Sequence, residues 1–219
     1  MSERTESKAA DTGSAAGDVC RLIHLGNTFE SAMTYAERQW SGADMQLVEK
    51  WCWEYANDVR NQTGSFVGDV IAETQEAEVA CTVDGVDLVG HVDQIRELNG
   101  QWYVWDIKTS RGAGETLVYD YAWQLAGYAV AATRTFGRVV LPGGIIRLRG
   151  YVGRGKKDPR DRDVFFYAPW TPKQCESMLG DAVAASQSTI ATPGDHCRYC
   201  PASGPNHCKE ELNDKEKRS

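Results

Sequence analysis

The sequence lacks any long run of apolar residues, and it has no excess of positive charge. No apolar run approaches the roughly 20 residues that span a bilayer, so we expect no membrane segment. Residues 1–18 are polar and mixed in charge and lack the apolar core of a secretory signal, so we expect a cytoplasmic protein. The formal net charge of -7 argues against a protein that coats nucleic acid, because such binding depends on neutralising phosphates.

Length and composition predict one globular domain with appendages. The chain has 219 residues, of which 42% are apolar and 25% are charged, as in an ordinary folded protein. Residues 1–18 are expected to be a disordered tail, because they carry few groups that could pack in a core. Residues 19–192 are expected to form the folded core, and residues 193–219 a cysteine-rich metal-binding segment with a polar tail.

Hydrophobic periodicity predicts an α/β fold. Apolar residues recur at helical spacing over 27–36 and 44–59, and again over 119–133. The forty residues after Gly68 predict three antiparallel strands joined by turns at Asp84-Gly85 and Asn99-Gly100. Further strands are expected over 139–152 and 164–167, and Thr171 and Pro172 are expected to open a last helix.

An acid and a lysine lie two residues apart in the third predicted strand. Because side chains alternate along a strand, Asp106 and Lys108 are expected on one face. Alone, this spacing is most often a surface ion pair. Asp93 lies thirteen residues earlier, beyond the Asn-Gly turn, and hairpin pairing can bring it beside Asp106. Two adjacent carboxylates repel each other unless a cation lies between them, which predicts a Mg2+ or Mn2+ site.

The order of these residues resembles a nuclease family. The chain reads Gly90-x-x-Asp93, then Asp106-Ile107-Lys108, then Gln124-x-x-x-Tyr128 on one face of the following helix. This set resembles the RecB-like branch of the PD-(D/E)XK nucleases over roughly residues 20–208. The resemblance implies a restriction-endonuclease-like mixed sheet with a helix on either side.

The resemblance also implies a role for each matching residue. Asp93 and Asp106 would bind the metal, together with the carbonyl oxygen of Ile107, and Lys108 would be catalytic. Gln124 and Tyr128 would support the site or contact DNA. Asp106 stands where Glu is common in the family, but both side chains donate oxygen.

The family usually adds a metal ligand, commonly His, four residues after a Gly on an early helix. Gly26 and Glu30 match that spacing, with Glu30 in place of His. Glu30 is therefore a candidate metal ligand, or else an exposed acid favoured by the helix dipole in the first turn. His24 and His91 are competing candidates, and His91 is expected to face outward from a hairpin.

The C-terminal cysteines predict a second metal site. Cys197, Cys200 and Cys208 lie in a segment without its own apolar core, which is typical of metal ligation. The fourth ligand is either His207, giving a local zinc site, or Cys20, giving a four-cysteine cage. The second arrangement resembles the iron-sulfur branch of these nucleases, the AddB and CRISPR-associated adaptation type, and implies a [4Fe-4S] cluster. The remaining alternative is that these thiols bind no metal or are paired in another way. Cys52, Cys81 and Cys175 lie in apolar patterns and are expected in the core.

A basic stretch from Arg147 to Arg162 offers a nucleic-acid contact or, equally, a solvated loop. The function predicted from these features is a metal-dependent DNA nuclease, an exonuclease acting on ends or single strands. Phage recombination and bacterial repair both fit such a site, with or without a recombination partner protein. Two rivals remain: a non-catalytic nucleic-acid-binding or assembly protein that keeps the fold, and a metal protein whose cysteines are its sole site.

Overall fold

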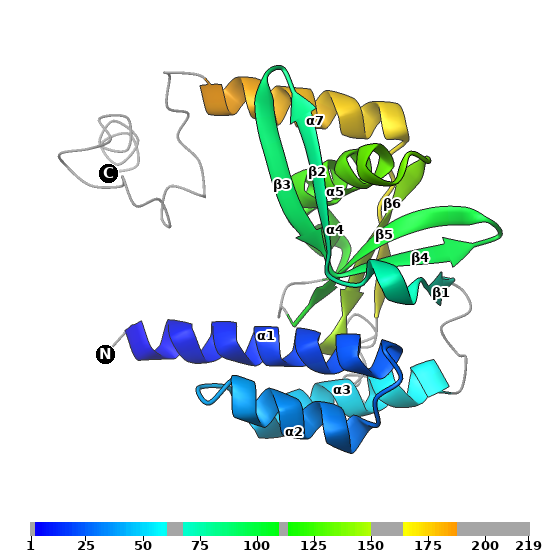
Figure 1. The fold of residues 1–219 in the computed structure, drawn as a ribbon. Coiled ribbons are helices and arrows are strands. Elements are labelled where there is room, and N and C mark those ends of the chain that lie inside the picture. Colours follow the sequence, from blue (N-terminus) through cyan, green and yellow to red (C-terminus); the bar gives the residue numbers. More distant parts are fainter. Residues whose placement is uncertain (1–2, 61–67, 110–113, 150–163, 188–219) are drawn as a thin grey trace. The chain divides into compact units, whose positions relative to one another are not determined.

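The computed structural model describes residues 3–60, 68–109, 114–149 and 164–187. The chain divides into two units, Met1–Gly180 and Asp181–Ser219, and the first contains nearly every described element. No described helix is long and apolar enough to cross a membrane. In chain order the elements are α1 (Glu3–His24), α2 (Phe29–Gln39), α3 (Met45–Arg60), β1 (Asp69–Val70), η1 (Ala72–Thr74), β2 (Ala77–Val83), β3 (Val86–Val92), β4 (Gln94–Leu98), β5 (Gln101–Lys108), α4 (Gly114–Asp120), α5 (Ala122–Phe136), β6 (Val140–Arg147), β7 (Phe165–Tyr167) and α7 (Pro172–Gln187) (Figure 1).

A five-stranded mixed sheet forms the centre of the first unit. Its order is β1-β4-β5-β6-β7, and β5 and β6 are parallel whereas the other pairs are antiparallel. The parallel pair requires a crossover connection, which α4 and α5 supply. This arrangement confirms the predicted α/β class with a mixed sheet flanked by helices.

The second predicted strand is two strands in the structure. β3 pairs with β2 in a separate hairpin, whereas β4 pairs with β1 and β5 in the main sheet. The chain passes from one sheet to the other at Asp93, so the predicted three-stranded meander is wrong. Both predicted turns are confirmed: Asp84 and Asn99 have φ of 47° and 53°, and each is followed by a Gly with positive φ.

Helix α1 corrects the expectation that residues 1–18 are a disordered tail. Residues 3–24 are helical, and Ala15, Ala16, Val19 and Cys20 are fully buried. They pack in one apolar cluster with α2, α3 and the sheet residues Trp105 and Ile146. Small side chains at helical spacing therefore supply a buried face in a stretch that has few large apolar residues.

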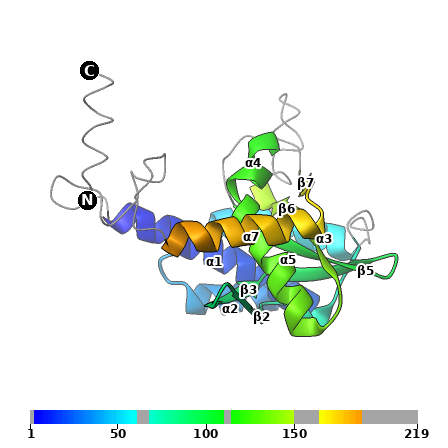
Figure 2. The same ribbon diagram turned by 90° about the horizontal axis from the view of Figure 1, so that it is seen from above.

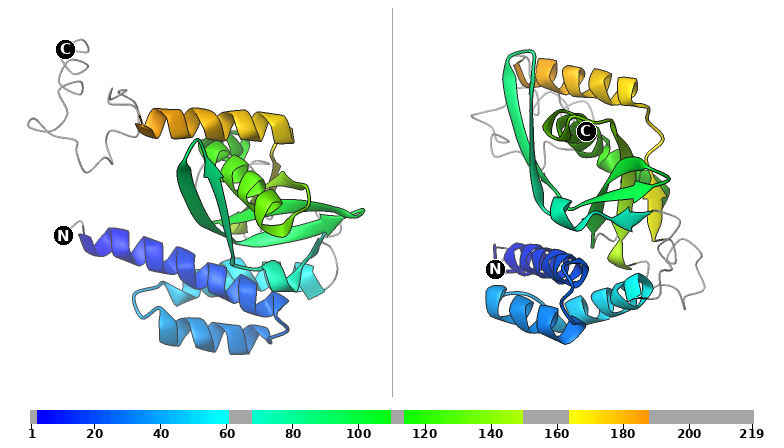
Figure 3. Two further views of the ribbon diagram at one scale, coloured as in Figure 1. Left: turned by 45° about the horizontal axis from the view of Figure 1, so that its top comes forward. Right: turned by 45° about the vertical axis from the view of Figure 1, so that its right-hand side comes forward.

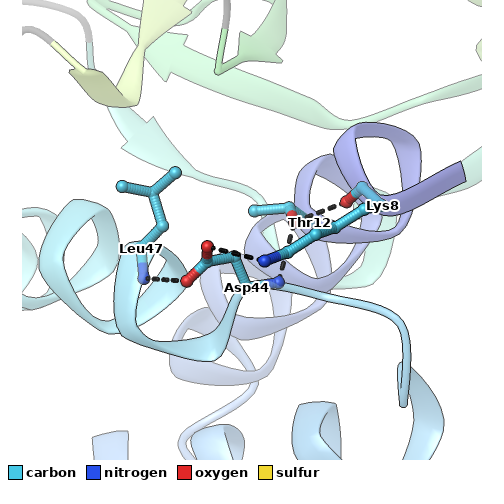
Figure 4. A network of polar contacts seen from close by, with 4 residues as sticks. All are labelled: Lys8, Thr12, Asp44 and Leu47. Carbon is cyan, nitrogen blue, oxygen red and sulfur yellow. Dashed lines mark hydrogen bonds and ion pairs between the residues drawn. The ribbon is translucent and has the colours of Figure 1, made fainter. Parts of the chain in front are cut away.

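Polar contacts fasten the early turns of α1 to the start of α3. Asp44 accepts a hydrogen bond from the Leu47 amide at 3.3 Å and contacts the Lys8 ammonium at 3.1 Å, while its own amide donates to the Thr12 hydroxyl at 2.9 Å (Figure 4). Asp44 is thus an N-cap of α3. Because the contacts are part-exposed, they contribute modestly, but they fix how α1 and α3 meet.

Helix α5 packs against the β2–β3 hairpin as well as the main sheet (Figures 2 and 3). The cluster between them contains Val79, Val92, Ile95, Ala126 and Cys175. The three cysteines predicted for the core, Cys52, Cys81 and Cys175, are all buried, which confirms that prediction.

The last described helix begins as predicted. The Thr171 hydroxyl accepts from the Gln174 amide at 3.4 Å, and the Gln174 side chain accepts from the Thr171 amide at 2.8 Å. This reciprocal pair is a capping box. The cysteine-rich segment 193–219, with Cys197, Cys200, His207 and Cys208, lies outside the described residues.

Candidate active site

The switch between the two sheets places Asp93 beside the end of β5. Gln94 pairs with Trp105, so the register brings Asp93 next to Asp106 across the hairpin. Asp93 Oδ2 accepts a 2.6 Å hydrogen bond from the Ile107 amide. One carboxylate oxygen is thereby fixed against the backbone of the residue that separates Asp106 from Lys108.

Asp106 and Lys108 meet on one face of β5, as strand alternation predicted. Lys108 Nζ lies 2.7 Å from Asp106 Oδ2, and the Asp106 side chain is only 1% exposed. Oδ2 is buried, and the Lys108 ammonium is its close partner among the described residues. The oxygen therefore keeps capacity for a further positive partner.

The site is short of positive charge. Burial and then the charge of Asp93 raise the pKa of Asp106 to about 7, against the opposing effect of Lys108. Burial also raises the pKa of Asp93, although the Ile107 amide and Lys108 lower it. Two buried carboxylates thus share one ammonium group, and the ionised pair is destabilised until another cation joins them.

Lys108 is held from two sides. Burial lowers its pKa, but the charge and contact of Asp106 and the charge of Asp93 outweigh burial, so its pKa is raised and it stays an ammonium. Its Nζ also lies 4.6 Å from the centre of the Tyr121 ring, in a cation-π contact. Tyr121 was not among the predicted site residues, because its position just before α5 has no motif of its own.

Gln124 and Tyr128 lie on one face of α5 and share a 2.9 Å hydrogen bond from the amide to the hydroxyl. Burial raises the pKa of Tyr128, and the charges of Asp106 and Asp93 raise it further, which places its ring near both acids. A Cβ on Gly90 would lie 2.8 Å from the Tyr128 ring. The Gly of the Gly-x-x-Asp motif therefore leaves room for this ring.

Glu76 is a third acid at the site, and the sequence motifs did not include it. It precedes β2 with a φ of 52°, and its amide donates to the Asp93 carbonyl at 3.4 Å. Burial and then the charge of Asp93 raise its pKa, and its own charge raises that of Asp106. Only the crossing between the sheets brings Glu76 here, so a linear motif could not have found it.

A second polar cluster lies behind Asp93. The Tyr55 hydroxyl accepts from the Gln94 amide at 2.7 Å and from the Arg96 guanidinium at 3.3 Å, and it also contacts the His24 ring. Arg96 donates further bonds to Gln94 at 3.0 Å and to the Gly68 carbonyl at 3.1 Å. This cluster ties α1 and α3 to β4 next to the candidate catalytic acid.

Other predicted residues lie elsewhere. Glu30 is exposed in the first turn of α2, so its role as a metal ligand stays a prediction. His24 is in the Tyr55 cluster, where burial and then Arg96 lower its pKa to about 3, so it is neutral. His91 is exposed on the hairpin as expected, 3.7 Å from Glu78.

Cys20 and Arg147 are both buried. The Cys20 thiol lies in the helical core beside Cys52, and burial raises its pKa well above the usual value. Arg147, the first residue of the predicted basic stretch, is 3% exposed and stacks on Phe166. It therefore does not belong to a surface loop, while residues 150–163 lie outside the described part of the chain.

The donor set fits a hard divalent cation. Asp93 and Asp106 present buried carboxylate oxygens, and the Ile107 carbonyl lies between Asp106 and Lys108 in sequence. Within the described residues, no three His, Cys, Asp or Glu side chains are close enough to hold a metal ion by themselves. Backbone oxygen and water would therefore complete the coordination, as is usual for Mg2+.

Comparison with known proteins agrees with this geometry. The family model of the PD-(D/E)XK nuclease superfamily matches residues 3–204, which is most of the chain. No curated protein and no solved structure gives a significant match. The matched range includes α1, in the part of the chain that was expected to be a tail.

Proposed function

The chain belongs to the PD-(D/E)XK nuclease superfamily, and from this we propose that it hydrolyses phosphodiester bonds of DNA with Mg2+ or Mn2+. Members of the superfamily typically use divalent cations on nucleic acids. The observation that carries the proposal is the pair of adjacent buried acids, Asp93 and Asp106, which share the ammonium of Lys108.

Asp93, Asp106 and the Ile107 carbonyl would hold the cation in this proposal. When bound, the cation would lower the pKa of a water ligand and neutralise charge on the phosphate. Asp93 is oriented for this by the Ile107 amide, which fixes one of its two carboxylate oxygens. Glu76 adds negative charge next to the two acids and strengthens the attraction for a cation.

Lys108 would act on the reacting groups directly. Its ammonium is held by Asp106 and the Tyr121 ring, so it can donate to a phosphate oxygen as negative charge develops there. Its raised pKa keeps it charged. Tyr128, with Gln124 donating to its hydroxyl, lies close enough to the acids to orient the substrate.

The test is hydrolysis of labelled linear DNA in Mn2+ by the purified protein. Lys108→Ala should lower kcat by about a hundredfold or more, because stabilisation of the developing charge is lost. Lys50→Ala, an exposed lysine on α3, is the matched control and should cleave normally. Native activity in Lys108→Ala, or no cleavage by the unaltered protein with either cation, would refute the proposal.

We further propose exonucleolytic cleavage of ends or single strands. Comparing circular with linear DNA tests it, since an exonuclease leaves intact circles uncut. A product from closed circles would show endonucleolytic cleavage instead.

The C-terminal cysteines remain a proposed second metal site. Cys20 is buried beside Cys52 in the helical core. The proposed fourth ligand is either Cys20, completing a [4Fe-4S] cluster, or His207, completing a local zinc site. Metal analysis of Cys20→Ala tests the choice. An unchanged zinc content supports the local site, whereas loss of iron would establish Cys20 as a cluster ligand.

A further inference from the structure

A pocket of about 160 Å3 opens between the β2–β3 hairpin and α5. Its walls are apolar, and the described lining includes no charged side chain. Leu88 and Val89 line it from the hairpin, Trp123, Gly127 and Ala131 from α5, and Leu179 from α7. An apolar pocket of this size suits a flat or apolar group.

The pocket shares a wall with the candidate active site. Gln124 and Tyr128 line it and are hydrogen-bonded to each other, and the charges of Asp106 and Asp93 act on Tyr128. Gly90 also lines it, three residues before Asp93, where the absence of a side chain lets the Tyr128 ring approach β3. A group bound in the pocket is thus adjacent to a phosphate bound at the acids.

Two large apolar side chains at the pocket remain exposed. Trp123 on α5 is 51% exposed and Val89 on β3 is 64% exposed, and both line the pocket. The packing of the core does not explain why these apolar side chains are here, because both are largely exposed. An exposed indole such as that of Trp123 can stack on a ligand. Bases stack on aromatic side chains regardless of sequence, and the neighbouring Gln124 amide can hydrogen-bond to a base edge.

We propose that this pocket binds an unpaired base of the substrate strand, next to the phosphate to be cleaved, with Trp123 as the stacking surface. The inference rests on the proposed nuclease function and names its substrate: a single strand or a frayed end. A base inside a duplex has both faces covered by its neighbours and cannot enter an apolar slot without leaving the stack. Unpaired bases enter without that cost.

The test measures binding in EDTA, so that it does not depend on catalysis. Fluorescence anisotropy compares a labelled oligothymidylate with a base-free chain of the same length and charge. Trp123→Ala should raise the Kd for oligothymidylate about tenfold and leave the Kd for the base-free chain unchanged, because stacking alone is removed. Trp53→Ala is the matched control: Trp53 is 44% exposed on α3 and does not line the pocket.

A second variant keeps Trp123 and fills the slot. Gly127→Leu places a side chain in the pocket, where a Cβ would meet Leu179 at an ordinary 3.7 Å, and helix stability should not fall. The same tenfold loss for oligothymidylate is expected. Unchanged binding in both variants, or equal losses for both chains, would overturn the proposal and would leave the patch as a surface for another protein.

Base binding and DNA cleavage can fail separately. If the protein binds bases through Trp123 but cuts no DNA in Mn2+, the proposed nuclease activity is refuted and the proposed base pocket is supported. A protein that cuts DNA while Trp123→Ala retains full affinity for oligothymidylate would do the reverse.

Discussion

Asp93 and Gln94 are neighbours in the chain, yet they join polar clusters of opposite character. Gln94 belongs to a group in which Tyr55 and Arg96 bond to one another and to the backbone. Asp93 belongs to a group in which two buried acids repel each other and share one ammonium group, that of Lys108. The hydrogen bonds of the first cluster join protein atoms to one another, whereas the second cluster has more negative than positive charge and is the proposed cation site.

This difference separates stability from proposed function between two adjacent residues, Asp93 at the crossing between the sheets and Gln94 at the start of β4. A satisfied buried network rigidifies the fold, while an unsatisfied one costs free energy until a ligand binds. The hydrogen bonds of Gln94, Tyr55 and Arg96 thus anchor β4 to the helices, and the two buried acids on the Asp93 side attract the proposed cation. Substitutions on the two sides should therefore have opposite effects.

The largest effect is expected from Asp106→Asn. Nuclease activity should fall by about a thousandfold, equivalent to about 4 kcal/mol, because a cation ligand is lost. Thermal stability at pH 8 without metal should stay level or rise, since the amide is neutral and the raised pKa of Asp106 shows that its charge is disfavoured. Asp84→Asn in the exposed hairpin turn is the control. If the variant lost both activity and stability, Asp106 would stabilise the fold, as Gln94 and Arg96 do, and the prediction would be wrong.

His24 should make the stability of the fold sensitive to acid, because it belongs to the cluster of Tyr55, Gln94 and Arg96, called here the anchoring cluster. Its folded pKa of about 3 lies below the unfolded value of 6.5, so the unfolded chain takes up a proton first as pH falls. This contribution is fully present above pH 6.5 and decreases as pH falls toward 3, by about 3 kcal/mol at pH 4.

Urea unfolding at pH 7 and pH 4 measures this loss. His24→Gln should show a smaller pH dependence than the unaltered protein, while exposed His91→Gln on the hairpin should match it. If all three proteins lost the same free energy of unfolding between pH 7 and pH 4, His24 would be protonated in the folded state at pH 4 and the prediction would be wrong.

Divalent cation should stabilise the unsatisfied cluster. Mn2+ at about 100 times its Kd should increase the free energy of unfolding by about 2.7 kcal/mol, because the folded state alone offers the site. Differential scanning calorimetry with Mn2+ or EDTA measures the shift in Tm. The shift should vanish in Asp106→Asn and persist in Asp84→Asn. A full shift in Asp106→Asn would locate the cation elsewhere.

The smallest effect is expected from Tyr55→Phe. Removing the hydroxyl leaves Gln94 and Arg96 short of a buried acceptor, so stability should fall by about 2 kcal/mol. Nuclease activity per folded molecule should stay at the level of the unaltered protein, because the Tyr55 hydroxyl bonds to Gln94 and Arg96 in the anchoring cluster. Tyr35→Phe, 44% exposed on α2, is the control for denaturant unfolding. A native-like unfolding curve for Tyr55→Phe would contradict the anchoring role.

Local rules predicted the parts of the site that lie on single elements. Strand alternation placed Asp106 with Lys108, helical spacing placed Gln124 with Tyr128, and the Asn-Gly turn set the register that brings Asp93 to Asp106. Each of these inferences depends on residues joined by one regular element or one tight turn, where geometry follows from the chain itself.

What could not be predicted depends on contacts between distant segments. The crossing between the sheets at Asp93 brings Glu76 to the site, and the turn before α5 brings Tyr121 beside Lys108. Neither residue lies at a sequence spacing that would have indicated its place in the site. Helix α1 was missed because its buried face is built from Ala15, Ala16 and Cys20, whose small size hid a periodic pattern. Tertiary packing decides such cases.

The contacts of α1 also determine where this protein can be shortened. A version beginning at residue 19 removes Ala15 and Ala16 from the core and deprives Asp44 of Lys8 and Thr12. The newly exposed faces of α2 and α3 would then be free to associate with other molecules. For expression and crystallisation, affinity tags are therefore better attached ahead of the first helical turn than in place of it.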